Sequence, residues 1–171
     1  MTEFRQRIRH PELLQLYDYW DKRRNGRRFP SRADIDPLDL KFVLGNLTLV
    51  DVLHDPLRFR FRLTGSLFTQ RMGLDLAGKF VDDIPDIPYR EKVQAIFSKM
   101  AESGEPSISL NERIIEGEPH KFEVLRLPLS EDGSTVTMLL TCAMYFDPPP
   151  NQPVLSRNAS RRFEPPKTID E

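Results

Sequence analysis

Paired carboxylates are the residues of this chain whose type and spacing come nearest to acid–base chemistry. Asp82-Asp83 and the pair Glu116 and Glu118 could divide the roles of acid and base if their environments differed. Both pairs lie in predicted turns, where solvated carboxylates keep pKa values of about 4 and are poor general acids at neutral pH. The chain also lacks a Gly-rich phosphate loop, a zinc-ligand spacing and a serine elbow. We therefore predict no catalytic residue and no enzyme; the alternative is a small α+β enzyme acting on a hydrophobic small molecule.

The three histidines and the single cysteine are the residues that could bind a metal or provide a reactive thiol. Imidazole is the commonest protein ligand of metals and haem, but His10, His54 and His120 fall at a helix start or at strand ends, which is typical of surface histidines. Cys142 lies in the middle of a predicted strand on its apolar side, as expected of a thiol packed in a core. A lone cysteine also excludes a disulfide framework within the chain. We predict no metal site, and the sequence identifies no cofactor.

Arginine alternates with apolar residues over 58–63, so a strand there would have one cationic and one apolar face. A row of guanidinium groups could bind an anionic ligand or partner. We instead expect the row to pair with carboxylates of neighbouring strands. The carboxylates available are those of Glu112, Glu116 and Glu123. Arg62 is kept as a candidate ligand-binding residue, because it lies beside Gly65, where the entrance of a pocket is expected.

Positive charge is concentrated at the start of the chain. Residues 1–32 hold nine Lys and Arg against four Asp and Glu, whereas the whole chain has a formal net charge of −1. Several arginines in the run 22–28 could bind nucleic-acid phosphates in a salt-dependent way. They are Arg23, Arg24, Arg27 and Arg28. The run belongs to no DNA-reading motif and lies where cations favour the end of a helix. A nucleic-acid-associated regulator is therefore a second alternative, and we do not expect nucleic acid to be a partner.

The spacing of apolar residues predicts an amphipathic helix near the N-terminus. His10-Pro11-Glu12 is a typical helix start, and Gly26 is expected to end the helix. One apolar stripe recurs at helical spacing, formed by Leu13, Leu16, Tyr17 and Trp20. We predict that this stripe binds a protein partner or a second copy of the chain in a homodimer. A second, short helix is expected after Asp36-Pro37, with Gly45 as its end.

Apolar alternation predicts five strands, at 47–54, 58–64, 107–115, 120–129 and 135–146. A short helix at 66–72 and a longer one at 89–103 lie between the second and the third strand, each followed by a glycine that ends it. The apolar residues of the last strand share one phase, which we expect to face helices or a cavity. They are Val136, Met138, Leu140, Cys142, Met144 and Phe146. This order of elements indicates an α+β fold with one five-stranded antiparallel sheet.

The length of 171 residues suits one domain with peripheral segments. We divide the chain into a basic N-terminal segment with the amphipathic helix (1–32), the α+β domain (33–146) and a proline-rich tail (147–171) that we expect to be disordered. No apolar run approaches the roughly 18 residues of a membrane span, and the N-terminal segment lacks the apolar core of a secretory signal. We therefore expect a cytoplasmic protein that does not insert into membranes.

Four short motifs in a fixed order resemble those of one bacterial PAS-fold family. They are Tyr17-Asp18-Tyr19-Trp20, Pro30-Ser31-Arg32-Ala33-Asp34-Ile35-Asp36-Pro37, Phe59-Arg60-Phe61-Arg62-Leu63-Thr64-Gly65 and Gly73-Leu74-Asp75-Leu76-Ala77-Gly78-Lys79. The resemblance covers residues 11–146. It implies a PAS-like sheet with an extra N-terminal helix. It also implies sensing or the regulation of a partner, since members of this largely uncharacterised family are mostly single-domain proteins whose pattern offers no catalytic residue.

We predict a non-catalytic sensory or adaptor module of bacterial signalling, with an apolar cavity between the sheet and the helices at 66–72 and 89–103. A small molecule in the cavity would prefer one arrangement of segment 66–88 and thereby change a partner-binding face. The predicted ligand-binding residues are Phe61, Arg62, Leu63, Phe68, Met72, Phe97, Met138 and Leu140. Apart from Arg62, the same residues would fill an empty core equally well.

Overall fold

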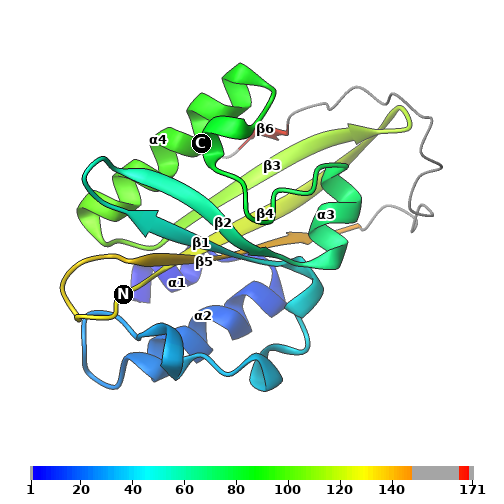
Figure 1. The fold of residues 1–171 in the computed structure, drawn as a ribbon. Helices are drawn as coiled ribbons and strands as arrows, with labels where there is room; N and C mark the ends of the chain where they lie inside the picture. The colour runs from blue at the N-terminus through cyan, green and yellow to red at the C-terminus, as the bar shows by residue number, and fades with distance from the viewer. Residues whose placement is uncertain (1, 148–165, 170–171) are drawn as a thin grey trace.

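A single antiparallel sheet organises the computed structural model, which describes residues 2–147 and 166–169. The described strands follow the order β2-β1-β5-β4-β3-β6 across the sheet (Figure 1). Their bounds are Leu47–Leu53 (β1), Arg58–Thr64 (β2), Ser107–Ile115 (β3), Glu118–Leu129 (β4), Met138–Tyr145 (β5) and Lys167–Thr168 (β6). The α+β class and the five predicted strands are confirmed, and the two-residue β6 is a sixth that the sequence pattern did not indicate.

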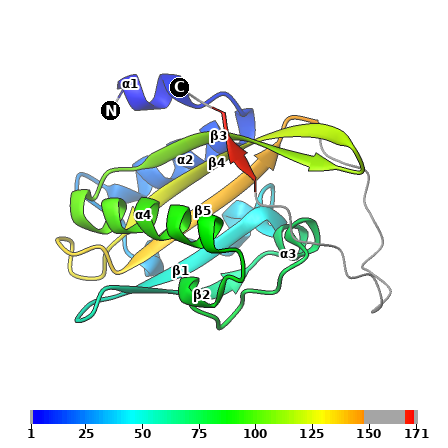
Figure 2. The same cartoon turned by 90° about the horizontal axis from the view of Figure 1, so that it is seen from above.

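Helices cover both faces of the sheet. The helices are α1 (Thr2–Arg7), α2 (Pro11–Arg24), α3 (Ser66–Met72) and α4 (Ile87–Ser103). Figures 1 and 2 show α1 and α2 on one face and α4 on the other. The core is correspondingly divided into two clusters, one that joins the sheet to α2 and one that joins it to α4 and the segment after α3.

The N-terminal helix α2 packs its apolar stripe on the chain's own sheet. His10 caps its start by accepting a hydrogen bond from the backbone N–H of Glu12, and Asn25 ends it in the left-handed region, one residue before the expected Gly26. The stripe residues have exposed fractions of 2% or less: Leu13, Leu16, Tyr17 and Trp20. The prediction that this stripe binds a partner or forms a homodimer is therefore wrong for this structure, because the sheet already covers it. The hydrophobic cluster under α2 also contains residues from both the predicted N-terminal segment (1–32) and the predicted α+β domain (33–146).

Two short 3-10 turns, Arg32–Asp34 and Pro37–Leu40, replace the second helix that the sequence predicted. The two start signals were recognised correctly, since Asp34 forms a capping box with Ser31 and Asp36 caps the backbone N–H of Leu38. The signals lie only five residues apart, so each one starts a turn of its own and neither turn extends into an α-helix.

Strand β2 is an edge strand with a bulge near its end. Cross-strand partners run from Leu49–Leu63 directly to Val50–Phe61, so one residue of β2, Arg62, has no partner on β1. An extra residue of this kind reverses the alternation of side chains beyond it. Phe61 is consequently buried, whereas Leu63 is 44% exposed. The strand bounds were predicted correctly, but the inward direction of Leu63 was not.

The C-terminal tail that we expected to be disordered, 147–171, lies largely outside the described residues. Of its described part, Lys167 and Thr168 form β6 and pair with Glu112 and Asn111 at the edge of β3. Within residues 2–147 and 166–169, no helix is long and apolar enough to cross a membrane.

Candidate functional site

A cavity of about 80 Å³ lies between the sheet and the helices α3 and α4. One water molecule requires about 10–15 Å³ of such space, so the cavity can hold several waters or a small organic molecule. Its apolar wall comes from α3 and the segment after it, from α4, from strands β2, β4 and β5, and from residue 166. It comprises Phe61, Phe68, Met72, Leu76, Val93, Ile96, Phe97, Phe122, Val124, Ala143 and Pro166. The location is the one predicted from the sequence.

The structure brings together four of the eight residues predicted to bind a ligand. Phe61, Phe68, Met72 and Phe97 line the cavity. Met138 and Leu140 do not, because they project from the opposite face of β5 and pack in the cluster under α2. Leu63 is turned outward by the bulge in β2. Arg62 forms an ion pair with Asp51 and does not line the cavity, so it does not lie at a pocket entrance as expected.

Helix α3, one wall of the cavity, is held in place by a backbone contact that only glycine permits. A Cβ atom on Gly65 would lie 2.3 Å from the carbonyl oxygen of Gly45, far inside van der Waals contact. The close approach places the start of α3 against the turn Leu44–Asn46. Gly73 then ends the helix in the left-handed region, with φ of 68°. The two glycines therefore set where α3 begins and ends; the end at Gly73 was predicted from the sequence.

Helix α4 forms the opposite wall. Asp86 caps it by accepting a hydrogen bond of 2.8 Å from the backbone N–H of Tyr89, and Gly104 ends it in the left-handed region. The helical spacing of its apolar residues then turns Val93, Ile96 and Phe97 toward the sheet. The end at Gly104 was predicted from the sequence, whereas the cap at Asp86 was not.

Polar and cationic side chains also line the cavity, which sequence reasoning missed. They are Asn46, Thr48, Arg71, Tyr89, Lys92, Asn111, Arg126, Thr141 and Tyr145. No Asp or Glu belongs to the lining among the residues that the structure describes. The polar phase of the last predicted strand, which contains Thr141 and Tyr145, was the available signal; it faces the cavity, whereas the apolar phase faces α2.

Arg71 of α3 is half-buried at the cavity wall. Its guanidinium donates a hydrogen bond of 2.6 Å to the Asn46 side-chain oxygen and lies over the Tyr145 ring at 5.0 Å. Both contacts are with neutral groups. Burial consequently lowers the pKa of Arg71 from its ordinary value. Arg113, which donates to the backbone oxygen of Arg71, places a further cation beside this wall.

Arg126 of β4 is a buried cation on the sheet side of the cavity. Its guanidinium donates to the Ser109 hydroxyl at 3.0 Å, and Ser109 also accepts hydrogen bonds from Asn111. Burial raises the pKa of the Tyr89 phenol, although Arg126 and Arg113 oppose that rise. Burial likewise raises the pKa of Tyr145 against the effect of nearby arginines. The two phenols therefore stay protonated at neutral pH in a positively charged environment.

Thr48 of β1 has a buried side-chain oxygen without a hydrogen-bond partner. The residue is 2% exposed, its Oγ1 atom makes no hydrogen bond, and its side chain lines the cavity. Leaving a buried hydroxyl unpaired costs about 1–3 kcal/mol. Such a group beside an internal space is the kind of atom that a bound molecule would satisfy.

The arginine row of β2 pairs with carboxylates, as predicted, but with different ones. Arg60 and Arg62 both bind Asp51, whose side chain is 6% exposed, at 2.9 Å and 2.6 Å. Arg58 binds Asp82 at 3.1 Å. The expected partners Glu112, Glu116 and Glu123 lie on β3, β4 and the turn between them, and β1 and β5 separate these strands from β2 in the sheet.

The histidines and the cysteine take structural positions. His10 caps α2, while His54 and His120 bond backbone oxygens of Val136 and Asp147. Cys142 is fully buried under α2, and burial raises the pKa of its thiol. In the part of the chain that the structure describes, no group of three or more His, Cys, Asp or Glu could hold a metal ion.

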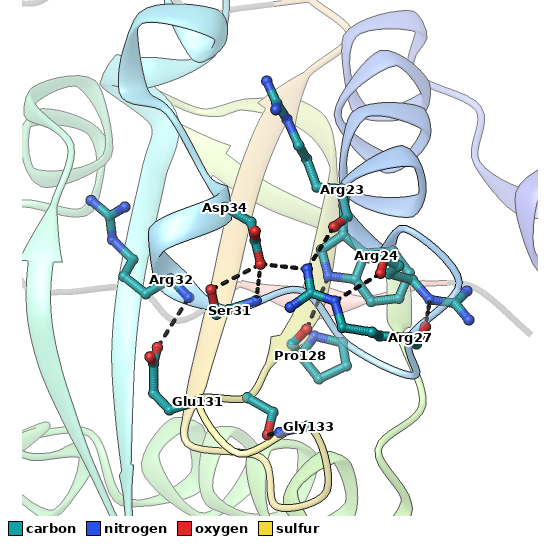
Figure 3. Close-up of polar contacts among 11 residues, drawn as sticks. Arg23, Arg24, Arg27, Ser31, Arg32, Asp34, Pro128, Glu131 and Gly133 are labelled. Carbon is teal, nitrogen blue, oxygen red and sulfur yellow. Dashed lines mark hydrogen bonds and ion pairs between the residues drawn. The ribbon is translucent and has the colours of Figure 1, made fainter.

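The basic run 22–28, in the last turn of α2 and directly after it, contacts other groups of the same chain. Arg27 donates to Asp34 at 2.7 Å, on the same carboxylate that caps the turn at Ser31, as Figure 3 shows. Arg23 binds Asp39 at 2.6 Å, and Arg28 donates to the backbone oxygen of Ser103 at 2.6 Å. Since these arginines already bind acceptors within the protein, no specific observation favours the nucleic-acid alternative.

Comparison with known proteins gives one family match and several similar structures. The family model described as PAS_5, PAS domain, matches residues 8–144. No curated protein matches the chain. Among solved structures, the PAS domain of BvgS from Bordetella pertussis is 12% identical with a TM-score of 0.48, over 67% of this chain and 89% of that chain. The LOV protein of Rhodobacter sphaeroides is 15% identical with a TM-score of 0.43, over 58% of each chain.

The VqmA–ligand–DNA complex of Vibrio cholera contains a third similar chain, 14% identical with a TM-score of 0.49, over 64% of this chain and 49% of that one. The present chain thus spans less than two thirds of the Rhodobacter and Vibrio proteins. Identities and TM-scores of this size indicate nothing about ligand or activity.

Proposed function

Because the chain belongs to the PAS_5 family of PAS domains, we propose that it is a sensory module that binds a small molecule between its sheet and the helices α3 and α4. The observation that carries this proposal is the cavity with the unpaired Thr48 hydroxyl on its wall. A ligand there would replace missing contacts of both the hydroxyl and the apolar wall. Ligand sites of proteins typically combine an apolar lining with a few polar groups in this way.

The proposed output is a shift of α3 and the segment that follows it. Helix α3 is only seven residues long, and it contributes Phe68, Arg71 and Met72 to the cavity wall. A ligand that contacts these residues in one arrangement of α3 more favourably than in another would change the populations of the two. The outer surface of α3 would then present a different face to a protein partner. We propose a bacterial signalling role, a cytoplasmic location and a non-catalytic mechanism as parts of the same hypothesis.

Native mass spectrometry of the freshly purified chain tests the proposal directly. We expect a mass adduct that is lost in the variant Ala143→Phe, because the added ring would occupy the cavity that Ala143 lines. Ala33→Phe is the matched control, since Ala33 is exposed in the turn after Ser31 and the same substitution there leaves the cavity unchanged. Circular dichroism verifies that both variants fold. The proposal fails if neither a retained molecule, a ligand captured from cell extract, nor a protein partner in a pull-down is found.

A further inference from the structure

The charged residues on the cavity wall all have the same sign. Arg71 comes from α3, Lys92 from α4 and Arg126 from β4, so three separate elements direct cations to one enclosed space. The lining contains no acidic residue among those described. Like charges that face a region of low dielectric repel one another more strongly than in water. The wall therefore presents positive charge to this space, which favours an anion there.

Arg71 gives the clearest indication of an anion-binding site. Its two contacts in the described structure are with the Asn46 amide oxygen and with the Tyr145 ring, which carry no formal charge. A guanidinium presents several donors in a planar fork that matches the two oxygens of a carboxylate. The hydrogen bond to the Asn46 amide oxygen uses only some of these donors. The same helix therefore supplies both an apolar wall residue, Phe68, and a cation that a carboxylate would complement.

Thr48 provides a second, independent indication. Its Oγ1 atom is buried, unpaired and on the cavity wall. A hydroxyl can donate to a carboxylate oxygen as well as accept, so an anion would satisfy it. The protonated phenols of Tyr89 and Tyr145 are further hydroxyl groups on the same wall.

The apolar part of the wall restricts which anion fits. Inorganic phosphate or sulfate would leave the aromatic and aliphatic side chains from Phe61 to Ala143 without contacts. A molecule with an apolar body would instead bury its carbon atoms against them, at roughly 25 cal/mol for each Å² removed from water. The volume of about 80 Å³ limits the body to a small one.

We infer that the cavity binds a small organic carboxylate, with the carboxylate paired to Arg71 and the apolar body packed against the aromatic wall formed by Phe61, Phe68 and Phe97. This inference rests on the proposed sensory function and specifies the chemical class of its ligand. It also gives the binding event a direct route to α3, because Arg71 and Phe68 belong to that helix.

An NMR titration of the full chain with matched probes tests the charge preference. The probes are isobutyrate, 4-methylpentanoate and benzoate, each compared with its own amide, which has nearly the same shape and no charge. Inorganic phosphate and isobutylamine serve as an anion without an apolar body and as a cation. We expect each carboxylate that binds to do so about tenfold or more tightly than its amide, since hydrogen bonds to charged groups are the stronger ones. The shifted resonances should belong to residues of the cavity wall.

Two variants locate the carboxylate. Arg71→Gln should remove the preference for acid over amide and leave binding of the amide nearly unchanged. Arg58→Gln is the control, because Arg58 forms a surface ion pair with Asp82 outside the cavity. Thr48→Val keeps the shape of the side chain and changes no charge. It should weaken carboxylate binding by a smaller factor than Arg71→Gln does.

The outcomes separate this inference from the proposed function. Amides that bind as tightly as acids, carboxylates that shift no cavity resonance, or a neutral or cationic molecule found by native mass spectrometry would overturn the carboxylate assignment and leave the sensory proposal standing. A cavity that retains no molecule of any charge, with no partner found, would contradict the sensory proposal itself. The comparison of acid with amide uses the unmodified protein, so it stands even if Arg71→Gln does not fold.

Discussion

The two faces of one sheet differ in how completely their side chains are packed. Along β4, Leu125, Leu127 and Leu129 point to α2 and have exposed fractions of 0%, whereas Val124 and Arg126 alternate with them and line the cavity. Alternation sends successive side chains to opposite faces. The same strands thus build a closely packed face under α2, which we call the packed face, and a face with an internal space under α3 and α4, the cavity face.

The two faces also differ in whether their buried polar groups have hydrogen-bond partners. Glu123 lies on the packed face with 2% exposure, and its carboxylate accepts hydrogen bonds from the backbone N–H groups of Arg9 and His10 at 3.0 Å and 2.9 Å. Thr48 on the cavity face is equally buried, but its hydroxyl has no partner. A polar group that serves stability is satisfied within the protein. A buried polar group that lies beside a cavity without a hydrogen-bond partner indicates that the residue was not selected for stability.

Leu16→Ala should give the largest loss of stability and establish which face holds the fold together. Leu16 is fully buried under α2, so its truncation should lower the free energy of unfolding by about 2–5 kcal/mol. Phe68→Ala, at a partly buried residue on the wall of an existing cavity, should cost less than Leu16→Ala, because fewer contacts are lost. Urea denaturation measures both. Equal losses would mean that the two faces do not differ as described.

Glu123→Ala should lower the free energy of unfolding by about 1–3 kcal/mol, since two buried N–H groups of the segment leading into α2 would lose their acceptor. Glu118→Ala is the control, because Glu118 is exposed at the start of the same strand. Exchange of the Arg9 and His10 amide protons should accelerate in the first variant only. Unchanged protection of these amides would show that the packed face does not depend on this anchor.

The packed face should also respond first to alkaline pH. Burial raises the pKa of Cys142 in the folded protein, whereas an unfolded thiol ionises at about 8.5. The contribution of the protonated Cys142 thiol to the free energy of unfolding is complete below about pH 8.5. It is lost as the pH rises toward the folded pKa, by at most about 1.4 kcal/mol per pH unit. Tyr89 and Tyr145 have pKa values that burial raises as well, but unfolded tyrosine ionises only near pH 10.

Denaturation curves between about pH 8 and 10 measure this effect. Cys142→Ala should start from a lower stability and show a flatter decline over that interval. A decline as steep as that of the parent protein would exclude Cys142 as its cause.

Thr48→Val should have the smallest effect and the opposite sign. In ligand-free protein it removes an unpaired hydroxyl without changing the shape, so stability should stay equal or rise by about 1 kcal/mol. Thr64→Val is the matched control, because the Thr64 hydroxyl accepts a hydrogen bond from Thr69 at 3.2 Å and its loss should cost about 0.5–1.5 kcal/mol. A clear destabilisation by Thr48→Val would show that the hydroxyl is satisfied in solution.

The sequence predicted the helices and strands well, but it predicted less well which groups each of their faces contacts. The ends of α2, α3 and α4 are marked by local signals, and so is β2 by its alternation; each was predicted within one residue. Which face of β5 meets the cavity depends on the helices packed across it, and no local pattern records that. The apolar phase with Met138 and Leu140 was assigned to the cavity because pockets are mostly apolar, but a closely packed face requires apolar residues even more.

The ion-pair partners and the polar lining of the cavity could be identified only from the three-dimensional fold. Asp51 is adjacent to Arg60 only because β1 and β2 pair, and the bulge that turns Leu63 outward has no signature in its sequence. Arg71 and Arg126 are 55 positions apart and carry no common motif. They line one cavity because α3 and β4 both contribute to its wall.

The bulge in β2 has a consequence for how such a chain can change during evolution. One extra residue in a strand exchanges the two faces from that point onward, and here the exchange affects only the last residues of an edge strand. The same insertion in the middle of β4 would move Arg126 under α2 and a leucine into the cavity. Insertions of a single residue are therefore expected among related sequences in β2 and in turns, while the central strands should accept substitutions but keep their length.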